Sequence, residues 1–302
     1  MKIIGFNNVG NTCYLASVLQ CFIYDTDFIK FIENSTNNEL TVELKKIING
    51  LNNDLRNLIR IVIREKPWFN GFEQNDSHEF LMCFMDILID KTKNQNIINE
   101  PVNKSWDMFI NGNNSEITKY YHGQTKSIIT CQKCNNSKNI YGEYCTLDLN
   151  VPEKNDGTKL LSIYDLFNNY LKNEVNDDLK NLYYCDFCKD STICTKKTGL
   201  WKLPKKLIIV LNRYSNNNRK INTPILFPIK SLLINESMTK KVFKYTLKSV
   251  VNHYGISHGG HYTSIIINNE DKYFIDDSNI NVIQKINNKD PSTYILFYEE
   301  CE

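Results

Sequence analysis

The hydrophobic pattern changes its period along the chain, and this change restricts the fold more than any single motif does. In the first third, apolar residues recur at three- and four-residue steps through 15–22, 40–51 and 55–62, and Pro67 closes the series. That spacing is typical of amphipathic helices. The last third contains short alternating or continuous apolar runs, which are typical of strands. The sequence therefore predicts an α+β fold, with helices first and a sheet last.

The expected strands of the last third lie close together along the chain. They are a continuous apolar run at 207–211, an alternating run at 242–250, and shorter runs at 262–267, 272–275 and 293–298. A continuous apolar run is typical of a strand that is covered on both faces. Short connections suit antiparallel neighbours, so we expect mostly antiparallel pairing.

Composition restricts the setting in which the chain works. Its 302 residues, 41% of them hydrophobic, can bury a sizeable core, and the formal net charge of +2 is close to balance. A nucleic-acid or anionic-membrane binder would show a strongly basic surface. The first residues do not resemble a signal peptide, and no apolar run approaches the roughly eighteen residues of a membrane span. We expect an intracellular monomer, cytoplasmic or nuclear, with no nucleic-acid or membrane partner.

Cys13 lies where a turn-rich segment, residues 5–12, runs into an apolar helix. Thr12 is a plausible N-cap, which would place Cys13 in the first helical turn. Unpaired N–H groups and the positive end of the helix dipole favour a thiolate there, and can bring a cysteine pKa from about 8.5 toward neutrality. Taken alone, Cys13 could equally be a small buried hydrophobe.

Two CxxC pairs interrupt the β-prone middle of the chain. The first is Cys131 with Cys134, and the second is Cys185 with Cys188. In a reducing compartment, two such pairs favour a closed tetrahedral zinc site, which is structural and leaves no position for water. Cys145 and Cys194 lie nearby and are weaker candidates.

A histidine-rich segment precedes a pair of aspartates in the predicted sheet. His253, His258 and His261 compete for the role of catalytic base, and Asp276 and Asp277 end the next strand. A histidine that opens one strand and a carboxylate that ends the next can meet across a hairpin, as a Cys–His–Asp site requires. His261 is favoured because two glycines precede it and would let a substrate backbone approach.

Asp76 and Glu79 have capping-box spacing before an apolar stripe at 80–88. This spacing predicts another helix start. On the residues alone, capping is a sufficient explanation for both carboxylates.

Together these motifs closely resemble the ubiquitin-specific proteases, the papain-like cysteine deubiquitinases, along essentially the whole chain. Several ordered motifs, widely separated, are far more specific than any one of them. The matching segments, in chain order, are 5–20, 74–80, 121–134, 203–214, 253–262, 275–278 and 294–298.

The resemblance implies one catalytic domain over residues 1–302 with a right-hand, papain-like architecture. A helical thumb would occupy 1–118, zinc-bearing β fingers mainly 119–200, and a β palm mainly 201–302. The fingers would grip the body of ubiquitin, and the four CxxC cysteines would hold a structural Zn²⁺.

The resemblance also implies the catalytic roles. Cys13 would be the nucleophile, His261 the general base and then acid, and Asp276 the residue that orients His261, with Asp277 beside it as helper or substitute. Asn8 would stabilise the oxyanion together with the Cys13 backbone N–H.

For the substrate, the resemblance implies that Asp76 and Glu79 receive arginines of the ubiquitin tail, and that Gly260 and Tyr262 line a narrow tunnel for its glycines. The expected reaction is hydrolysis of the peptide or isopeptide bond after the C-terminal glycine of ubiquitin, through an acyl-enzyme on Cys13. The alternatives are a protease for a ubiquitin-like modifier and a binding module that holds ubiquitin without cutting it.

Departures from the family pattern are few and concern hydrogen bonding near the thiol and the fit of the tail. None touches a catalytic group. The positions that differ are Phe6, Ala16, Asn75, Ser77, Tyr214 and Ile275.

Overall fold

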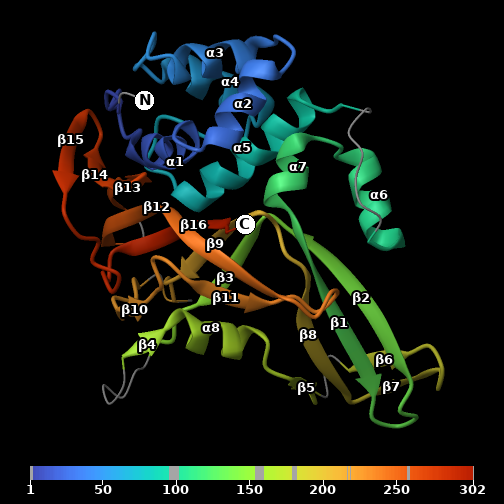
Figure 1. Cartoon of the computed structure of the whole chain (residues 1–302). Coiled ribbons are helices and arrows are strands. Elements are labelled where there is room, and N and C mark those ends of the chain that lie inside the picture. Colours follow the sequence, from blue (N-terminus) through green and yellow to red (C-terminus); the bar gives the residue numbers. More distant parts are fainter. Residues whose placement is uncertain are drawn as a thin grey trace.

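The structure is a computed structural model in which a helical layer lies against a large sheet, and a second, smaller sheet extends away from both (Figure 1). The residues that it describes are 3–94, 102–153, 160–178, 182–215, 217, 219–256 and 259–301. Among these residues, no helix combines the length and the apolar character that crossing a membrane requires.

The first third is helical, as the periodicity predicts. Asp25, Asn38, Asn103 and Ser115 each accept a backbone N–H at the start of a helix, which is how polar side chains satisfy the first turn. The helices of this layer are α1 (Cys13–Ile23), α2 (Thr26–Asn34), α3 (Glu39–Ile48), α4 (Arg56–Glu65), α5 (Ser77–Lys91), α6 (Lys104–Gly112) and α7 (Glu116–Tyr121).

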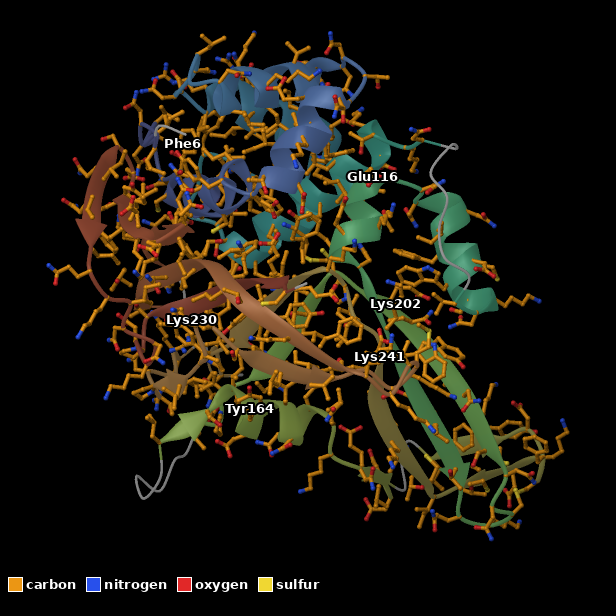
Figure 2. The ribbon with its side chains drawn as sticks, in the orientation of Figure 1. Phe6, Glu116, Tyr164, Lys202, Lys230 and Lys241 are labelled. Carbon is orange, nitrogen blue, oxygen red and sulfur yellow. The ribbon has the colours of Figure 1, made fainter. Side chains whose placement is uncertain are left out.

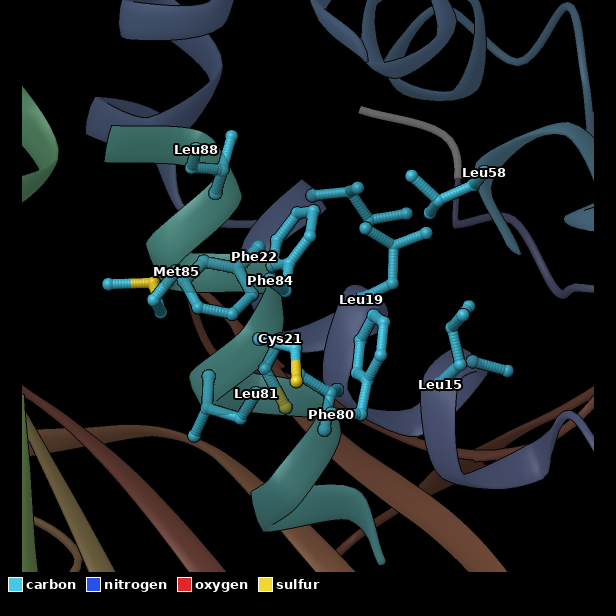
Figure 3. Packing of buried hydrophobic residues seen from close by; sticks show 14 of the residues in the cluster. Leu15, Leu19, Cys21, Phe22, Leu58, Phe80, Leu81, Phe84, Met85 and Leu88 are labelled. Atoms are coloured by element: carbon cyan, nitrogen blue, oxygen red, sulfur yellow. The ribbon is translucent and has the colours of Figure 1, made fainter. Parts of the chain in front are cut away.

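Helix α1 is buried along its entire length and lies between α5 and the large sheet. Figure 3 shows Leu15, Leu19 and Phe22 of α1 facing the side chains of Phe80 and Phe84 on α5. The Phe22 and Phe84 ring centroids lie 5.6 Å apart in an edge-to-face arrangement, which is a favourable geometry for aromatic pairs. Helix α1 is therefore fixed from several sides, and Cys13 begins it.

The large sheet contains every strand expected in the last third. Its strand order is β15-β14-β13-β12-β16-β9-β3, with β11 added beside β12, and only the β3–β9 pair is parallel among the pairings of this sheet that the structure describes. Its strands are β3 (Thr146–Asn150), β9 (Lys206–Asn212), β11 (Leu232–Asn235), β12 (Val242–Ile256), β13 (Gly259–Asn268), β14 (Asp271–Asp276), β15 (Asn279–Ile283) and β16 (Thr293–Glu300).

Strand β9 explains why residues 207–211 are apolar without interruption. Ile208 and Val210 pack into the core shared with the helices, whereas Leu207, Ile209 and Leu211 pack into a second core on the opposite face. Alternate side chains of a strand point to opposite faces. Both faces of this strand are therefore covered, as the sequence predicts.

The smaller sheet projects away from the other two layers, and many of its side chains point to solvent (Figure 2). Its strand order is β2-β1-β8-β5, and a two-stranded β6–β7 unit lies at its tip. Lys202, at its base, places its ammonium 5.0 Å from the ring centroid of Trp106 in α6. The bounds are β1 (Gly123–Cys131), β2 (Ser137–Tyr144), β5 (Glu174–Asn176), β6 (Tyr183–Cys185), β7 (Asp190–Thr192) and β8 (Cys194–Lys202).

Two elements between residues 119 and 200 pack with the large sheet and not with the smaller one. Strand β3 pairs with β9, and helix α8 (Ile163–Tyr170) packs into the second core beside the short parallel pair β4 (Leu161–Ser162) and β10 (Ile225–Leu226). We keep the division of the chain into thumb, fingers and palm at residues 118 and 200 as a proposal, with β3 and α8 assigned to the palm.

Candidate active site

No side chain of the loop before α1 caps the first turn of this helix, which begins at Cys13. Thr12 occupies the N-cap position, but its side chain does not cap the helix. Its hydroxyl accepts the Val9 N–H at 3.1 Å and lies 3.3 Å from Asn8 Oδ1. The backbone N–H groups of Cys13 and Tyr14 instead act on the Cys13 sulfur, where they lower the thiol pKa.

Burial nevertheless decides the protonation of this thiol. Cys13 is only 7% exposed. Its pKa is raised, first by burial and further by the Asp277 charge, although the N–H groups of Tyr262, Tyr14 and Cys13 act in the opposite direction. The expectation that the helix start alone lowers this pKa toward neutrality is therefore wrong, because desolvation outweighs the helix terminus. The thiol needs a base.

His261 and Asp276 meet across the β13–β14 hairpin, as the sequence predicts. His261 Nε2 lies 2.6 Å from Asp276 Oδ1. The two strands are antiparallel neighbours in the sheet, which brings the start of one beside the end of the other. Since Nε2 is held by the carboxylate, Nδ1 is the ring nitrogen left for the thiol.

Cys13 lies beside the strand that carries His261, because it lines the cleft together with Gly260 and Tyr262. Helix α1 packs against β13, and the backbone N–H of Tyr262, the residue after His261, lowers the pKa of the Cys13 thiol. The described residues include no hydrogen bond between the Cys13 thiol and the His261 ring. Catalytic hydrogen bonds are often loose before substrate binds and tighten in the complex.

Asn8 is held in one orientation by the loop and by Asp277. Its Oδ1 accepts the N–H groups of Gly10 and Thr12, each at 3.2 Å, and its Nδ2 donates to Asp277 Oδ2 at 2.9 Å. Asp277 has a φ of 49°, a left-handed conformation that is uncommon for a residue with a side chain. Asn8 and Asp277 are therefore coupled directly, which the sequence did not indicate.

Gly5 allows this loop to approach the end of the β14 hairpin. A Cβ at Gly5 would lie 2.6 Å from the carbonyl oxygen of Ser278. The next residue, Phe6, donates its N–H to the Asp277 carbonyl at 3.0 Å. The segment before Cys13 and the residues after Asp276 are thus packed backbone to backbone.

His253 has a different environment from His261. It is 3% exposed, and its Nδ1 lies 2.7 Å from the Tyr214 hydroxyl. Burial, with positive charge on Lys220 and Arg213, lowers its pKa to about 4. His253 is therefore a neutral, buried histidine. His258, the third candidate, lies outside the described residues.

A small cleft of about 60 Å³ opens beside Cys13 between the helical layer and the sheet. Gln74 spans it, because Gln74 Oε1 accepts the Gly260 N–H at 3.2 Å. A Cβ at Gly260 would lie 2.3 Å from His253 Nε2, so this glycine is required by packing inside the protein. The lining residues are Asn11, Cys13, Tyr14, Gln74, Asn75, Asp76, His253, Gly259, Gly260 and Tyr262.

Asp76 and Glu79 differ sharply in their surroundings. Asp76 Oδ1 accepts the N–H groups of His78 and Glu79 at 2.7 and 3.2 Å, so Asp76 caps α5. The reciprocal bond from Glu79, which a capping box requires, is not present among the described hydrogen bonds. Glu79 is exposed at the surface. Sequence reasoning missed the main partner of Asp76, the Tyr294 hydroxyl, which lies 2.9 and 2.8 Å from its two oxygens.

The four CxxC cysteines converge at the tip of the smaller sheet. Their ligand atoms all lie within 4.8 Å of one another. The sulfurs of Cys131 and Cys188 are 3.6 Å apart, and those of Cys134 and Cys185 are 3.7 Å apart. Four sulfurs bound tetrahedrally at about 2.3 Å from zinc would lie about 3.8 Å from each other, so the donor set and its spacing fit this ion. Neither Cys145 nor Cys194 belongs to the described cluster.

A family model described as ubiquitin carboxyl-terminal hydrolase matches residues 4–298. Human ubiquitin carboxyl-terminal hydrolase 21 is 27% identical over 348 residues, covering 98% of this chain and 61% of the relative, so the chain spans about three fifths of that protein. Chicken ubiquitin carboxyl-terminal hydrolase 2 is also 27% identical, covering 98% of this chain and 92% of the relative.

Solved structures show the same fold. The Ubp8/Sgf11/Sus1/Sgf73 SAGA DUB module bound to monoubiquitin contains a chain that matches with a TM-score of 0.80 and 23% identity, over 99% of this chain and 69% of that one. A yeast SAGA DUB module matches with a TM-score of 0.78 and 25% identity, over 99% and 69% of the two chains. The α+β fold is confirmed by these matches.

Proposed function

The chain belongs to the ubiquitin carboxyl-terminal hydrolase family, and we propose that it hydrolyses the peptide or isopeptide bond after the C-terminal glycine of ubiquitin. One observation carries the proposal. Helix α1, which begins at Cys13, packs against β13, and Cys13 shares one narrow cleft with Gly260 and Tyr262, the two neighbours of His261. His261 itself is paired with Asp276. A thiol, an oriented imidazole and a slot of this size suit acyl transfer from a slender glycine tail.

His261 would act first as base and then as acid. Because burial raises the pKa of Cys13, the thiolate forms when the His261 ring takes the proton. Asp276 holds Nε2 of that ring and stabilises the imidazolium. The thiolate then attacks the carbonyl carbon of the last glycine, His261 protonates the departing amine, and water hydrolyses the acyl-enzyme on Cys13.

Asn8 would stabilise the oxyanion that forms during this attack. Its amide carries two N–H donors, and Asp277 accepts from the amide nitrogen at 2.9 Å. The second hydrogen remains for the developing charge, and the bonds to Asn8 Oδ1 keep the amide from rotating. Asp277 would thus act through Asn8, whereas Asp276 acts through His261.

Zinc would be the structural cofactor of the fingers, held by Cys131, Cys134, Cys185 and Cys188. All four ligand positions are filled by sulfur, so the ion would take no part in the reaction. Its contribution would be to hold the β6–β7 unit on the ends of β1 and β8.

Ubiquitin would bind between the fingers and the palm, and a related chain is described in complex with monoubiquitin. Glu79 is exposed, three residues after the cleft residue Asp76, and would receive a basic residue of the tail. Gly260 and Tyr262 line the cleft itself. We propose that the chain acts as a monomer, in the cytoplasm or the nucleus.

The decisive experiment uses a fluorogenic amide of the ubiquitin C-terminus. Cys13→Ala or His261→Ala should reduce turnover by about 10⁴-fold or more, as removal of a catalytic nucleophile or base does elsewhere. Cys21→Ala, at a buried cysteine of the same helix, is the matched control and should keep the activity. Near-wild-type turnover by Cys13→Ala would refute the proposal.

Two alternatives are tested with the same protein. A ubiquitin carrying a C-terminal electrophile should attach covalently to Cys13, whereas a module that only binds ubiquitin would form no adduct. Parallel kinetics with ubiquitin and with ubiquitin-like modifiers ending in two glycines decide the substrate.

A further inference from the structure

Strand β15 forms an outer edge of the large sheet, and the structure describes no strand paired with its far side (Figure 1). A two-residue turn, Asp277 and Ser278, joins it to β14, and Asp276 pairs with Asn279 across this turn. The first four residues of β15 are exposed. The large sheet therefore ends here in an open strand.

The register of this hairpin decides which backbone groups face outward. In an antiparallel ladder, pairs that exchange hydrogen bonds alternate with pairs that do not. Asp276 and Asn279 flank a two-residue turn and form a bonded pair, so Ile280 and Val282 lie between bonded positions. The N–H and C=O groups of Ile280 and Val282 consequently point away from β14. None of the described backbone hydrogen bonds between elements uses these groups.

The open edge has none of the usual protection against pairing with another chain. Exposed edges are normally blunted by lysine, proline, a bulge or a covering group. Residues 279–283 include no charged residue and no proline, and their pairing with β14 contains no bulge. By contrast, the edge strand β11 is covered, because the Leu233 N–H donates to the Tyr164 hydroxyl at 3.1 Å.

The side chains along this edge are apolar and continue a buried face of the sheet. Ile280 lies opposite Ile275, and Val282 lies opposite Tyr273. Ile275 and Tyr273 pack against the core that the sheet shares with the helices. Ile280 is 37% exposed and Val282 is 72% exposed. An added strand would therefore cover two apolar side chains as well as the free backbone groups.

The open edge begins at the reacting groups. Asp276 Oδ1 lies 2.6 Å from His261 Nε2, and Asp277 accepts from Asn8 at 2.9 Å. The turn that carries both aspartates leads directly into β15. At about 3.3 Å per residue, the edge from Asn279 to Val282 extends roughly 10 Å away from them.

The narrow cleft leaves this edge free. Its lining includes His253, Gly260 and Tyr262 of the sheet, but no residue of β14 or β15. When the ubiquitin tail fills the cleft, the part of the substrate beyond the scissile bond lies outside it. That part carries the modified lysine, and it is the chain that must pass the β14–β15 turn.

We propose that β15 binds the substrate segment that carries the modified lysine, as a strand added to the open edge. This inference rests on the proposed function and names the class of acceptor that the enzyme prefers, which is a lysine in an extended segment. Main-chain hydrogen bonds to Ile280 and Val282 provide affinity for any such segment. Their side chains favour apolar residues at alternate positions of the segment.

The first test compares two substrates of Val282→Pro. This substitution removes an outward N–H and leaves the pairing with β14 intact. One substrate is the fluorogenic ubiquitin amide, which has no segment beyond the bond. The other is ubiquitin linked through an isopeptide bond to the central lysine of a peptide with valine at alternate positions. We expect kcat/KM for the conjugate to fall about 5- to 10-fold, as for one lost hydrogen bond, and kcat/KM for the amide to stay within about twofold.

Two further variants at the same position complete this test. Val282→Thr keeps the backbone and the shape of the side chain, so it is the matched control and should keep both rates within about twofold. Val282→Lys keeps the strand but places a charge on the apolar edge, so it should also slow the conjugate and spare the amide. If neither Val282→Pro nor Val282→Lys slowed the conjugate more than the amide, the proposal would be wrong.

A measurement without catalysis keeps this inference distinct from the proposed function. The same peptide without ubiquitin is added at millimolar concentration, and the exchange of the Ile280 and Val282 amide hydrogens is followed by NMR. Both should be protected in wild type, and Ile280 should stay unprotected in Val282→Pro. If wild type cleaved no ubiquitin amide while this protection appeared, the proposed function would fail and the binding role of β15 would stand.

Two results of the exchange measurement would refute the binding role. One is unchanged exchange at Ile280 and Val282 in a protein that cleaves the conjugate. The other is protection that appears without peptide and grows with protein concentration, because the edge would then pair with a second copy of this chain.

Discussion

The cleft lies between two packed layers, whereas the fingers extend from those layers as a sheet with little burial on either face. Cys13, Tyr14 and Tyr262, which line the cleft, are all less than a tenth exposed. In the fingers, the middle of β1 is half-buried and the first half of β2 is exposed. The most buried side chains near the finger tip are cysteines, including Cys131 and Cys185.

This difference shows two ways of fixing side chains. Around the cleft, segments more than two hundred residues apart are joined by many contacts, such as those of Asn8 with Asp277 and of Asp76 with Tyr294. In the fingers, four sulfurs replace an apolar core. Substitutions at the cleft should therefore lower the reaction rate while the fold is kept. Loss of the metal should unfold the finger tip while the reacting groups keep their positions.

Metal loss should have the largest effect. A structural zinc site contributes an apparent ~10–16 kcal/mol in small zinc-finger peptides, and less is expected here because β1 and β8 already order part of the site. Cys185→Ser should lose bound zinc and the hydrogen-exchange protection of β6 and β7, and should raise KM for ubiquitin. The alkylation rate of Cys13 should not change.

Cys194→Ala is the control for that variant, because Cys194 is buried in β8 beside the cluster but is not part of it. It should keep one zinc per chain. If Cys185→Ser also kept a full zinc ion, the fingers would not depend on these sulfurs, and the contrast with the cleft would fail.

Lys206 should be the next most sensitive position, because it joins the helical layer to the large sheet. Its buried ammonium forms ion pairs with Asp25 at 2.9 Å, with Asp27 at 3.0 Å and with Glu299. Removing one partner of a buried ion pair costs about 3–5 kcal/mol. Lys206→Met should therefore lower the free energy of unfolding of the whole thumb and palm, measured in urea.

The adjacent Lys205→Met should change the free energy of unfolding by no more than about 0.5 kcal/mol, because Lys205 is exposed. A similar small effect for Lys206→Met would mean that the layers are held by apolar packing alone.

Asn8→Ala tests whether kcat can fall while the structure around the cleft is kept. Removing one oxyanion donor typically lowers kcat about 10²- to 10³-fold. We expect this loss with KM nearly unchanged and zinc retained. Asn8→Asp should be at least as slow, because it keeps the acceptor for Gly10 and Thr12 but places a negative charge against Asp277.

Asn7→Ala, at the exposed neighbouring asparagine, should keep full activity. A wild-type kcat for Asn8→Ala would show that Asn8 only orders the loop.

Low pH should reduce the stability of both regions, through one buried histidine in each. We expect each histidine to have a smaller effect than the three changes above. Burial lowers the pKa of His122, at the root of the fingers, to about 4 from an ordinary 6.5, and lowers the pKa of His253, which lines the cleft, to a similar value. A depressed histidine pKa means that the unfolded chain binds protons first. The stabilisation is therefore complete above pH 6.5 and is lost as the pH falls toward 4.

For His122 this loss amounts to about 3 kcal/mol, since each pKa unit corresponds to about 1.4 kcal/mol. Urea unfolding of wild type should show the decline between pH 6.5 and 4. His122→Gln should show a shallower decline that leaves the part due to His253. An unchanged slope in this variant would place the acid-sensitive group elsewhere.

Most elements of the fold follow from local patterns. Helices α1, α3, α4 and α5 match the apolar periodicity, and the continuous run at 207–211 correctly indicates a strand that is covered on both faces. The spacing of His261 before Asp276 matches their pairing across a hairpin, because antiparallel neighbours are close in the sequence. Likewise, the CxxC pairs predict a cysteine cluster without any knowledge of the fold.

The roles of some residues are decided by partners that their local sequence pattern does not indicate. Threonine often caps helices, yet the Thr12 hydroxyl accepts a hydrogen bond from Val9 in the preceding loop. Gly260 suggests room for a substrate, yet the His253 ring already occupies the space of a side chain there.

The sequence by itself determined the elements, the cysteine cluster and the pairing of His261 with Asp276, because each depends on residues a short distance apart or on a repeated spacing. Only the tertiary structure decided the raised pKa of Cys13, the partner of Asp76 and the link between Asn8 and Asp277. Burial and hydrogen bonding across layers are set by which surfaces meet, and no local pattern contains that information.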